Sequence, residues 1–371
     1  MRLDATAATT FDLPESLSAS EPPEARGIRR DQVRLLVAHG HRLWHGRFAD
    51  LPDHLAPRDL VVVNTSSTLP AAIDGQLQDG RSVVVHFSTA LDDGTWVIEV
   101  RPAVHAHGPV TSLVSGDQVR LTRDASATLV TAYPDASEPA TRLWRTVISV
   151  PDVLRLLLRH GRPITYGYVP DRWPLEEYQT IFATHPGSAE MPSAGRPFTM
   201  ALVTSLITRG VRIAPVTLHT GVSSPEAVEA PAPERYDVPE ATAELVNLTR
   251  RTGNRVIATG TTVTRALETV ADANGSVSSG QGWTDLVLGP DRPATVVDGL
   301  ITGWHAPGSS HLLLLEAVAG PGLVSEAYEQ AALHGYLWHE FGDSLLLLPD
   351  EGYGPSGRPA GPTRATERKG S

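Results

Sequence analysis

The chain has 371 residues, a formal net charge of −11 at pH 7 and an apolar fraction of 41%, which suit one large or two smaller globular domains. It has no cysteine, which excludes disulfides, thiolate nucleophiles, zinc–thiolate sites and iron–sulfur clusters. Its single lysine, Lys369, lies in a polar tail, so a Walker-type phosphate loop and a Schiff-base enzyme are excluded as well.

The net charge and the N-terminal segment indicate which partners and which cellular location to expect. A net charge of −11 argues against a dedicated nucleic-acid-binding protein, which usually has a basic domain. The N-terminal segment lacks the continuous apolar core of a signal peptide, and no apolar run reaches membrane-spanning length. We therefore expect a cytoplasmic protein that is a monomer.

Two clusters of ionisable side chains precede the first predicted strand. Arg26, Arg29, Arg30 and Arg34 lie in segment 25–34, which is explained equally well as a solvated surface or as a track for phosphates. Three histidines lie in 39–46 (HGHRLWHG) without a carboxylate at metal-ligand spacing. We interpret them as surface residues and expect no metal site.

A buried strand and then a β-rich region follow. Residues 59–63 (DLVVV) form a β-branched run that predicts a strand ending at Asn64. Between about 74 and 150, short strand-like runs are separated by DG, DDG and SGD turns, a pattern typical of a small antiparallel barrel or sandwich. Segment 151–160 predicts a helix with proline in its first turn.

Strands and helices alternate in the rest of the chain. Helices are expected at 199–209, 239–253, 261–275, 309–320 and 325–336, and strands at 211–219, 255–260, 285–289, 299–305 and 344–349. Such alternation is typical of parallel βα units. We predict an α/β domain formed by 1–73 and 151–350, an inserted β-domain at 74–150 and a disordered tail at 351–371.

The predicted α/β strands share one feature, which is that each ends in polar or ionisable residues. These are Asn64, His219, the pair Thr261 and Thr262, and His305. In parallel α/β folds the ligand lies beyond the carboxyl ends of the strands. A lone histidine there is more often a hydrogen-bonded core residue than a catalyst, but two at matching ends favour a shared pocket. Asp343, just before the last strand, is either a turn former or a carboxylate that faces the same pocket.

The stretch 255–268 (RVIATGTTVTRALE) is the most informative of these strand ends. Gly260 lets the backbone approach another group closely, and Thr261 or Thr262 can cap the helix that follows. Free N–H groups at a helix start attract an anion or carboxylate, and Arg265, one turn in, can reach the same ligand. A plain helix cap with a surface arginine explains the pattern equally well.

Taken in order, these segments resemble the S-adenosylmethionine:tRNA ribosyltransferase-isomerase family of the queuosine pathway. The resemblance extends from FDLPESL near the N-terminus through Asp343 and the strand after it. It rests on DLVVVN, YQTIFATHPGSAEMPSAGRPFT, VTLHTG, RVIATGTTVTRALE, VDGLITGWHAP and the AY…FGDSL ending. It implies a distorted α/β barrel with an inserted small antiparallel β-barrel.

The resemblance also implies an unusual use of S-adenosylmethionine as a substrate. Enzymes of this family transfer its ribosyl carbons to an aminomethyl-deazaguanine on tRNA and release adenine and methionine, with no metal or redox cofactor. The sulfonium acidifies the C5′ hydrogens, so a base can start adenine elimination while the amine adds to the rearranging sugar. With the strand-end argument, the resemblance selects His219, His305 and Asp343 for catalysis. It selects Asn64, Gly260, Thr261, Thr262, Arg265 and Asp298 for substrate binding.

Several positions depart from the family's pattern. Ser67, Ala72 and Leu337 stand where the family has arginine, and Pro197 stands where it has a pocket histidine. Segments 221–225 (GVSSP) and 229–233 (EAPAP) replace the family's Gly-Ala-Gly-Thr-Phe and His-x-Met-His segments. Losing arginines removes bidentate contacts to phosphate or carboxylate. We infer that the half of the site that holds the sulfonium nucleoside is kept and that the acceptor half is rebuilt.

Three hypotheses follow. The first is the family's ribosyl transfer to deazaguanine-modified tRNA. The second is a divergent relative that uses S-adenosylmethionine with a small acceptor, or only eliminates or hydrolyses it. The third is a non-catalytic protein that senses the nucleoside. The resemblance favours the first, whereas the substitutions and the charge of −11 favour the second and disfavour tRNA as a partner. The third needs loss of the strand-end residues, which are present.

Overall fold

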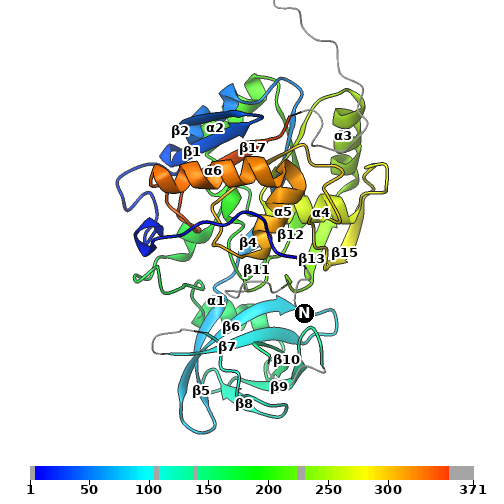
Figure 1. The fold of residues 1–371 in the computed structure, drawn as a ribbon. Helices are drawn as coiled ribbons and strands as arrows, with labels where there is room; N and C mark the ends of the chain where they lie inside the picture. The colour runs from blue at the N-terminus through cyan, green and yellow to red at the C-terminus, as the bar shows by residue number, and fades with distance from the viewer. Residues whose placement is uncertain (1–4, 104–107, 137–140, 224–229, 351–371) are drawn as a thin grey trace, which may run out of the picture.

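The computed structural model describes residues 5–103, 108–136, 141–223 and 230–350. These residues form an α/β domain with a large sheet and, at one end of it, a closed antiparallel barrel (Figure 1). The predicted fold class, α/β with an inserted small antiparallel β-barrel, is confirmed. The domain predicted as a distorted α/β barrel is built on a nine-stranded sheet. The segment predicted to be a disordered tail, 351–371, lies outside the described residues.

The large sheet has nine strands in the order β15-β13-β12-β3-β14-β16-β17-β1-β2. Their bounds are β1 Arg34–His39, β2 Arg42–Arg47, β3 Leu60–Asn64, β12 Arg212–Leu218, β13 Glu234–Val238, β14 Val256–Thr259, β15 Gly280–Thr284, β16 Gly299–Thr302 and β17 Ser344–Leu348. Strands β12, β3, β14 and β16 are parallel, as the βα alternation predicts. Strand β17 runs antiparallel to β16, with Thr302 opposite Leu345. The carboxyl ends of the four parallel strands and the amino end of β17 therefore meet at one edge.

The central strands are apolar throughout because each face of the sheet is covered. Every residue of β3 and of β16 is buried. Since successive side chains point to opposite faces, Val62 and Leu300 join one core, whereas Val61 and Ile301 join another. The covering helices are α2 Met200–Thr208, α3 Glu240–Arg251, α4 Thr261–Thr269, α5 Ser310–Ala319 and α6 Pro321–Leu333. The first of these packs in the second core, and the others pack in the first.

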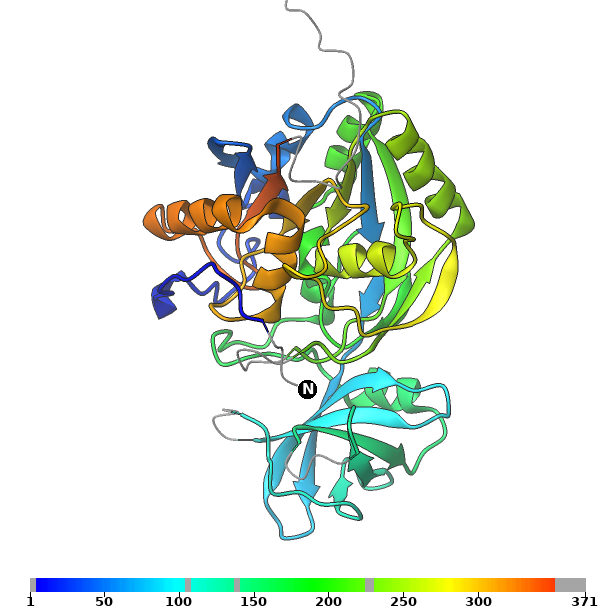
Figure 2. The same ribbon diagram turned by 45° about the vertical axis from the view of Figure 1, so that its right-hand side comes forward.

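The inserted barrel closes on itself in the order β10-β7-β6-β5-β8-β9, with each pair antiparallel. Its strands are β5 Ala72–Leu77, β6 Ser82–Ala90, β7 Trp96–Pro102, β8 Gln118–Arg120, β9 Ser126–Ala132 and β10 Leu143–Ile148. Helix α1 (Val153–His160) follows, and its first turn is capped by Asp152, which accepts a hydrogen bond from Arg155 N at 2.9 Å. Figure 2 shows the barrel below the large sheet, joined to it at both ends of the insertion.

The remaining elements are short. Strands β4 (Ser66–Thr68) and β11 (His185–Ser188) form a two-stranded parallel sheet. The 3₁₀ turns are η1 Glu15–Leu17, η2 Arg30–Gln32, η3 Phe48–Asp53, η4 Leu175–Tyr178 and η5 Ser193–Gly195. Among the described residues, no helix combines the length and apolar character needed to cross a membrane.

Two sequence-based assignments of secondary structure are corrected. Residues 285–289 are not a strand, because the strand at that place is β15, which ends at Thr284 and pairs with β13. Residues 34–47 form the hairpin of β1 and β2, where the sequence predicted no element, and the histidines interpreted as surface residues, His39, His41 and His45, are exposed as predicted. The exposed β2 carries His45, while β1 is buried through its pairing with β17.

Candidate active site

A cavity of about 440 Å³ lies at the edge where the strand ends meet, a size suited to a ligand of nucleoside dimensions. Its wall includes residues that follow β12, β14 and β16, namely 220–223, 260–262 and 302–306. Segments 189–194 and 339–340 also form part of the wall. The barrel contributes Ser88 and Arg142, so the inserted domain forms part of the same site.

The junction between β14 and α4 forms one wall. Gly260 has φ of 92°, a backbone conformation that favours glycine, and a Cβ there would lie 3.2 Å from that of Ala194. Helix α4 begins at Thr261, and its N-cap is Gly260 without a side-chain cap, so the predicted threonine cap is wrong. The hydroxyl of Thr262 instead accepts a hydrogen bond from the Asn64 amide at 3.2 Å. The first N–H groups of α4 lie at the cavity wall and need partners.

Arg265 lines the cavity, but its guanidinium is held by the protein. It forms an ion pair with Glu234 and donates to the carbonyl oxygens of Thr284 and Leu286, each at 3.0 Å. Only 6% of the residue is exposed, so the alternative of a surface arginine is wrong. Burial raises the pKa of Glu234, and Arg265 opposes that effect. The arginine therefore fixes a carboxylate at the cavity wall.

An uncharged part of the cavity is formed by two histidines and their neighbours. The rings of His305 and His311 are stacked with centroids 4.4 Å apart. Burial lowers the pKa of His305 well below its usual range and that of His311 to about 4, so both are neutral at pH 7. His305 Nε2 is hydrogen-bonded to Thr302 Oγ1 at 3.0 Å.

Three polar atoms in the cavity wall are buried without a hydrogen-bond partner among the described residues. They are Trp304 Nε1, Tyr178 Oη and Ser309 Oγ. Buried polar groups in folded proteins are almost always hydrogen-bonded, so an unpartnered group in a cavity indicates a ligand or water as its partner. Trp304 is 2% exposed and Tyr178 is 3% exposed.

A charged and aromatic part of the cavity was missed by the sequence analysis. The hydroxyl of Tyr166 donates to Glu190, and that of Tyr168 donates to Glu340 at 2.8 Å. The Tyr168 ring is stacked between Tyr166, with centroids 6.0 Å apart, and His339, at 4.0 Å. Burial raises the pKa of Glu340 to about 7. These residues lie in irregular segments without periodicity, so only the nearness of Glu340 to Asp343 in the sequence pointed to them.

The other predicted site residues support the cavity from outside its wall. Asn64 donates to Leu218 O at 2.8 Å and accepts from Leu218 N at 3.1 Å, which fixes the ends of β3 and β12 together. His219 Nδ1 is hydrogen-bonded to Ser66 Oγ at 2.7 Å, and burial lowers the pKa of its ring to about 4. Asp343 accepts hydrogen bonds from Arg34 N at 2.7 Å and Leu337 N at 2.9 Å. None of the three is among the described residues that line the cavity.

Asp298 lies away from the site. It precedes β16, and its carboxylate accepts a hydrogen bond from Val256 N at 2.8 Å. Both residues are at the amino ends of their parallel strands, opposite to the end that faces the cavity. Asp298 is therefore not among the described residues that line the cavity, because a residue that precedes a parallel strand lies at the other edge of the sheet.

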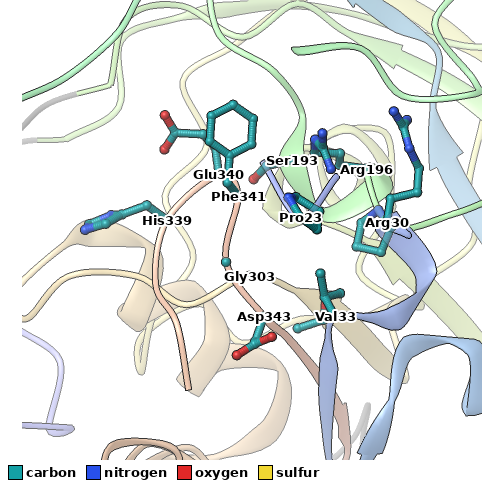
Figure 3. Close-up of a pocket in the computed structure, with 13 residues that line it drawn as sticks. Pro23, Arg30, Val33, Ser193, Arg196, Gly303, His339, Glu340, Phe341 and Asp343 are labelled. Atoms are coloured by element: carbon teal, nitrogen blue, oxygen red, sulfur yellow. The ribbon is translucent and has the colours of Figure 1, made fainter. Parts of the chain in front are cut away.

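A small hollow of about 10 Å³ lies between Asp343 and Arg196 (Figure 3). Arg30 and Arg196 lie together on one side of it, while His339 and Glu340 lie on the other. Arg196 is 2% exposed and forms ion pairs with Glu24 at 2.8 Å and Glu177 at 2.7 Å.

The basic cluster at 26–34 is likewise engaged within the protein. Arg30 pairs with Glu24 at 3.0 Å, Arg26 donates to Phe341 O at 2.7 Å, and Arg34 lies 3.8 Å over the Tyr336 ring. These contacts use the side chains that a phosphate track would need.

Comparison with known proteins identifies relatives over nearly the whole chain. Residues 6–347 match the family model described as queuosine biosynthesis protein. The S-adenosylmethionine:tRNA ribosyltransferase-isomerase of Thermotoga maritima is 34% identical over 347 residues, which cover 91% of this chain and 98% of that protein. The protein of the same name from Symbiobacterium thermophilum is 35% identical over 351 residues, with coverage of 91% and 98%.

A solved structure agrees with these matches. The crystal structure of S-adenosylmethionine tRNA ribosyltransferase from Thermotoga maritima superposes with a TM-score of 0.51 and 31% sequence identity, covering 92% of this chain and 99% of that one. The similarity thus includes both the α/β domain and the inserted barrel. The chain belongs to the queuosine biosynthesis protein family, whose curated relatives are S-adenosylmethionine:tRNA ribosyltransferase-isomerases.

Proposed function

We propose that the protein is an S-adenosylmethionine-dependent ribosyltransferase-isomerase that uses the ribosyl part of this substrate and releases adenine and methionine. The observation that carries the proposal is that one cavity is lined both by neutral rings, its uncharged part, and by carboxyl groups with aromatic rings, its charged part. A sulfonium nucleoside can use both kinds of group, because its base is neutral and its sulfur is a cation. Its cation is attracted both by carboxylates and by ring faces.

The charged part offers three carboxyl groups to a cation. Glu190, Glu234 and Glu340 all line the cavity, together with the rings of Tyr166 and Tyr168. Arg142 and Arg265 also line it, and Arg265 is already paired with Glu234. The local balance therefore favours a cationic ligand over an anionic one.

The uncharged part suits a nucleobase. His305 and His311 present neutral stacked rings, and Leu286, Leu288 and Leu314 lie in the same wall. Trp304 Nε1 and Ser309 Oγ supply polar atoms without a protein partner. The N–H groups at the start of α4, at Thr261 and Thr262, are placed to receive the ligand's carboxylate or ribose hydroxyls.

The acceptor of the ribosyl group is a separate question. A small molecule is a second candidate, beside tRNA. Four positions where the family pattern has arginine or histidine are Ser67, Ala72, Pro197 and Leu337. Three arginines that remain, Arg26, Arg30 and Arg196, are engaged in contacts within the protein. Since binding to tRNA depends on cationic contacts to several phosphates, these observations favour a small amine acceptor or water over tRNA.

Incubation with S-adenosylmethionine, followed by chromatography for adenine and methionine, tests both the use of this substrate and the identity of the acceptor. The reaction is run without acceptor, with unmodified tRNA and with deazaguanine-modified tRNA. Release of both products without tRNA supports the small-acceptor candidate, whereas release only with modified tRNA supports the acceptor of the curated relatives. Binding without turnover under all three conditions, and also with a small primary amine as acceptor, would overturn the proposed enzyme and support a sensor.

Direct binding to tRNA gives an independent measurement. We expect affinities no better than the ~10⁻⁴–10⁻⁶ M of non-specific contacts at physiological salt. Submicromolar binding of the modified tRNA, with clearly weaker binding of the unmodified form, would rule out the small-acceptor candidate.

A further inference from the structure

The three carboxyl groups in the cavity differ in how fully the protein occupies them. Glu190 accepts hydrogen bonds from Tyr166 Oη and from Ser223, whose backbone N–H lies at 2.8 Å and whose Oγ lies at 2.6 Å. Glu234 is paired with Arg265 and accepts from Gly221 N at 3.0 Å. Glu340 has one side-chain donor among the described residues, the hydroxyl of Tyr168 on Oε2. Glu340 is therefore the carboxyl group with most capacity left to accept a proton.

From this geometry we propose that Glu340 is the catalytic base that removes a C5′ proton from the sulfonium nucleoside, and that Tyr168 positions it. The inference rests on the proposed function, because it needs that substrate in the cavity. Neither residue belongs to the set selected from the sequence.

The proton transfer is balanced within the site. The carboxylate of Glu340 takes the proton from C5′ and becomes a carboxylic acid, while the electron pair of the broken C–H bond stays on C5′. The adjacent sulfonium stabilises that carbanion through its positive charge. The electron pair on C5′ then forms a C4′=C5′ double bond as the C4′–O4′ bond breaks, and the ring oxygen forms a C1′=O4′ double bond as the C1′–N9 bond breaks. Adenine leaves with the electron pair of the C1′–N9 bond and takes the proton from Glu340, which becomes a carboxylate again.

Competing bases are weaker or are occupied. His305, His311 and His339 have lowered pKa values, so their neutral rings bind a proton poorly at pH 7. Asp343 accepts two backbone hydrogen bonds and faces the small hollow. A general base works best when its pKa is close to the working pH, and Glu340, with a pKa raised to about 7, meets that condition.

The groups around Glu340 explain its proton affinity. Burial is the main cause of the raised pKa of Glu340, hydrogen bonds from its own backbone N–H and from Tyr168 oppose the rise, and the nearby Glu190 raises the pKa further. Tyr178, whose pKa is raised by burial and by Glu340, is an uncharged neighbour. On the side of the small hollow, the charged groups are Arg30, Arg196 and Asp343. The guanidinium of Arg196 is already paired with Glu24 and Glu177.

Tyr168 is suited to a positioning role because its ring cannot turn freely. The stacked rings of Tyr166 and His339 confine it, and its hydroxyl then directs one carboxyl oxygen of Glu340. His339 has a positive φ of 72°, which is uncommon for a residue with a side chain. This backbone conformation precedes Glu340 directly and sets the direction from which its carboxyl enters the cavity.

The test is the pH dependence of adenine release in the full-length chain, measured between pH 5.5 and 9 at saturating S-adenosylmethionine with the best acceptor found. For the wild type we expect a rate that rises with pH through about 7. Glu340→Gln should lower kcat by about 100-fold and remove the rise, with a much smaller change in KM. Glu340→Asp should restore part of the rate, because it keeps a carboxyl group.

The variant Tyr168→Phe distinguishes a positioning role of Tyr168 from a purely structural one. Its hydrogen bond favours the carboxylate, so its loss should move the midpoint of the profile to higher pH while the enzyme stays active. A merely structural role for Tyr168 would lower the rate without moving that midpoint. Glu190→Gln is the matched comparison, because it removes a neighbouring carboxyl and should move the midpoint to lower pH.

The outcomes distinguish this inference from the proposed function. A Glu340→Gln enzyme with the wild-type rate and profile would overturn the role of Glu340 alone. Loss of the pH dependence in His305→Gln, with retention in Glu340→Gln, would assign the base to His305 instead. A wild-type protein that releases no adenine with any acceptor would overturn the proposed function and, with it, the inference.

Discussion

The β14–α4 junction and the segment before β17 reach the same cavity from opposite chain directions. At the junction, Gly260 and Thr261 follow a parallel strand and lie at its carboxyl end. Before β17, His339 and Glu340 precede a strand that runs antiparallel to β16. Both segments line the cavity because the amino end of an antiparallel strand lies beside the carboxyl end of its neighbour.

This difference explains which site residues the sequence could predict. The rule that ligands lie beyond the carboxyl ends of parallel strands selects Thr262 and His305, and both line the cavity. The same rule gives no reason to examine residues before β17, because the direction of that strand follows from the assembled sheet. Glu340 was therefore missed, although Asp343 three residues later was selected.

A similar limit applies to the fold. Strands with apolar runs, such as β3 and β17, were predicted because burial on both faces makes them apolar throughout. The edge strands β2 and β15, and β13 beside β15, are mostly not buried, so their polar sequences carry no such pattern. The resemblance to the family supplied the arrangement of the two domains, which local patterns do not contain.

The largest expected effect concerns Arg265, at the junction. Because it is buried and paired with Glu234, Arg265→Ala leaves a buried carboxylate without its cation and should reduce the free energy of unfolding by about 3–5 kcal/mol. Chemical denaturation at pH 7 measures this. The matched control is Arg209→Ala, which breaks an exposed pair with Asp53 and should cost at most about 1 kcal/mol. Equal losses in the two variants would show that the buried pair of Arg265 with Glu234 supports the fold no more than an exposed pair does.

The segment before β17 should show its effect in the pH dependence of stability. The pKa of Glu340 is raised from 4.5 to about 7 in the fold, so the folded state holds a proton that the unfolded chain has lost between these pH values. Stability therefore falls as pH rises from about 4.5 through 7, by up to about 3 kcal/mol. Glu340→Gln should remove this component, so that the variant gains stability relative to the wild type at pH 8 compared with pH 5.

Thermal unfolding at the two pH values measures that difference. Glu177→Gln is a control, since Glu177 is a carboxyl group that pairs with Arg196 and is not among the described residues that line the cavity. If the Glu340→Gln variant follows the wild-type pH dependence, the carboxyl of Glu340 in the wild type is exposed to water. The segment before β17 would then differ from the β14–α4 junction in chain direction alone.

The smallest expected effect on activity is at Asp298, which tests the rule of strand direction itself. Asp298 and Gly260 lie at opposite ends of the adjacent strands β16 and β14. Asp298→Ala removes a hydrogen bond to Val256 N and should cost about 1 kcal/mol of stability, with adenine release unchanged within about twofold. Gly260→Ala is the matched variant at the cavity end, where φ of 92° and the approach of Ala194 to 3.2 Å oppose a side chain. It should reduce adenine release much more than Asp298→Ala does. The opposite order of the two activities would mean that substrate lies at the amino ends of the strands, and the site proposed at their carboxyl ends would be wrong.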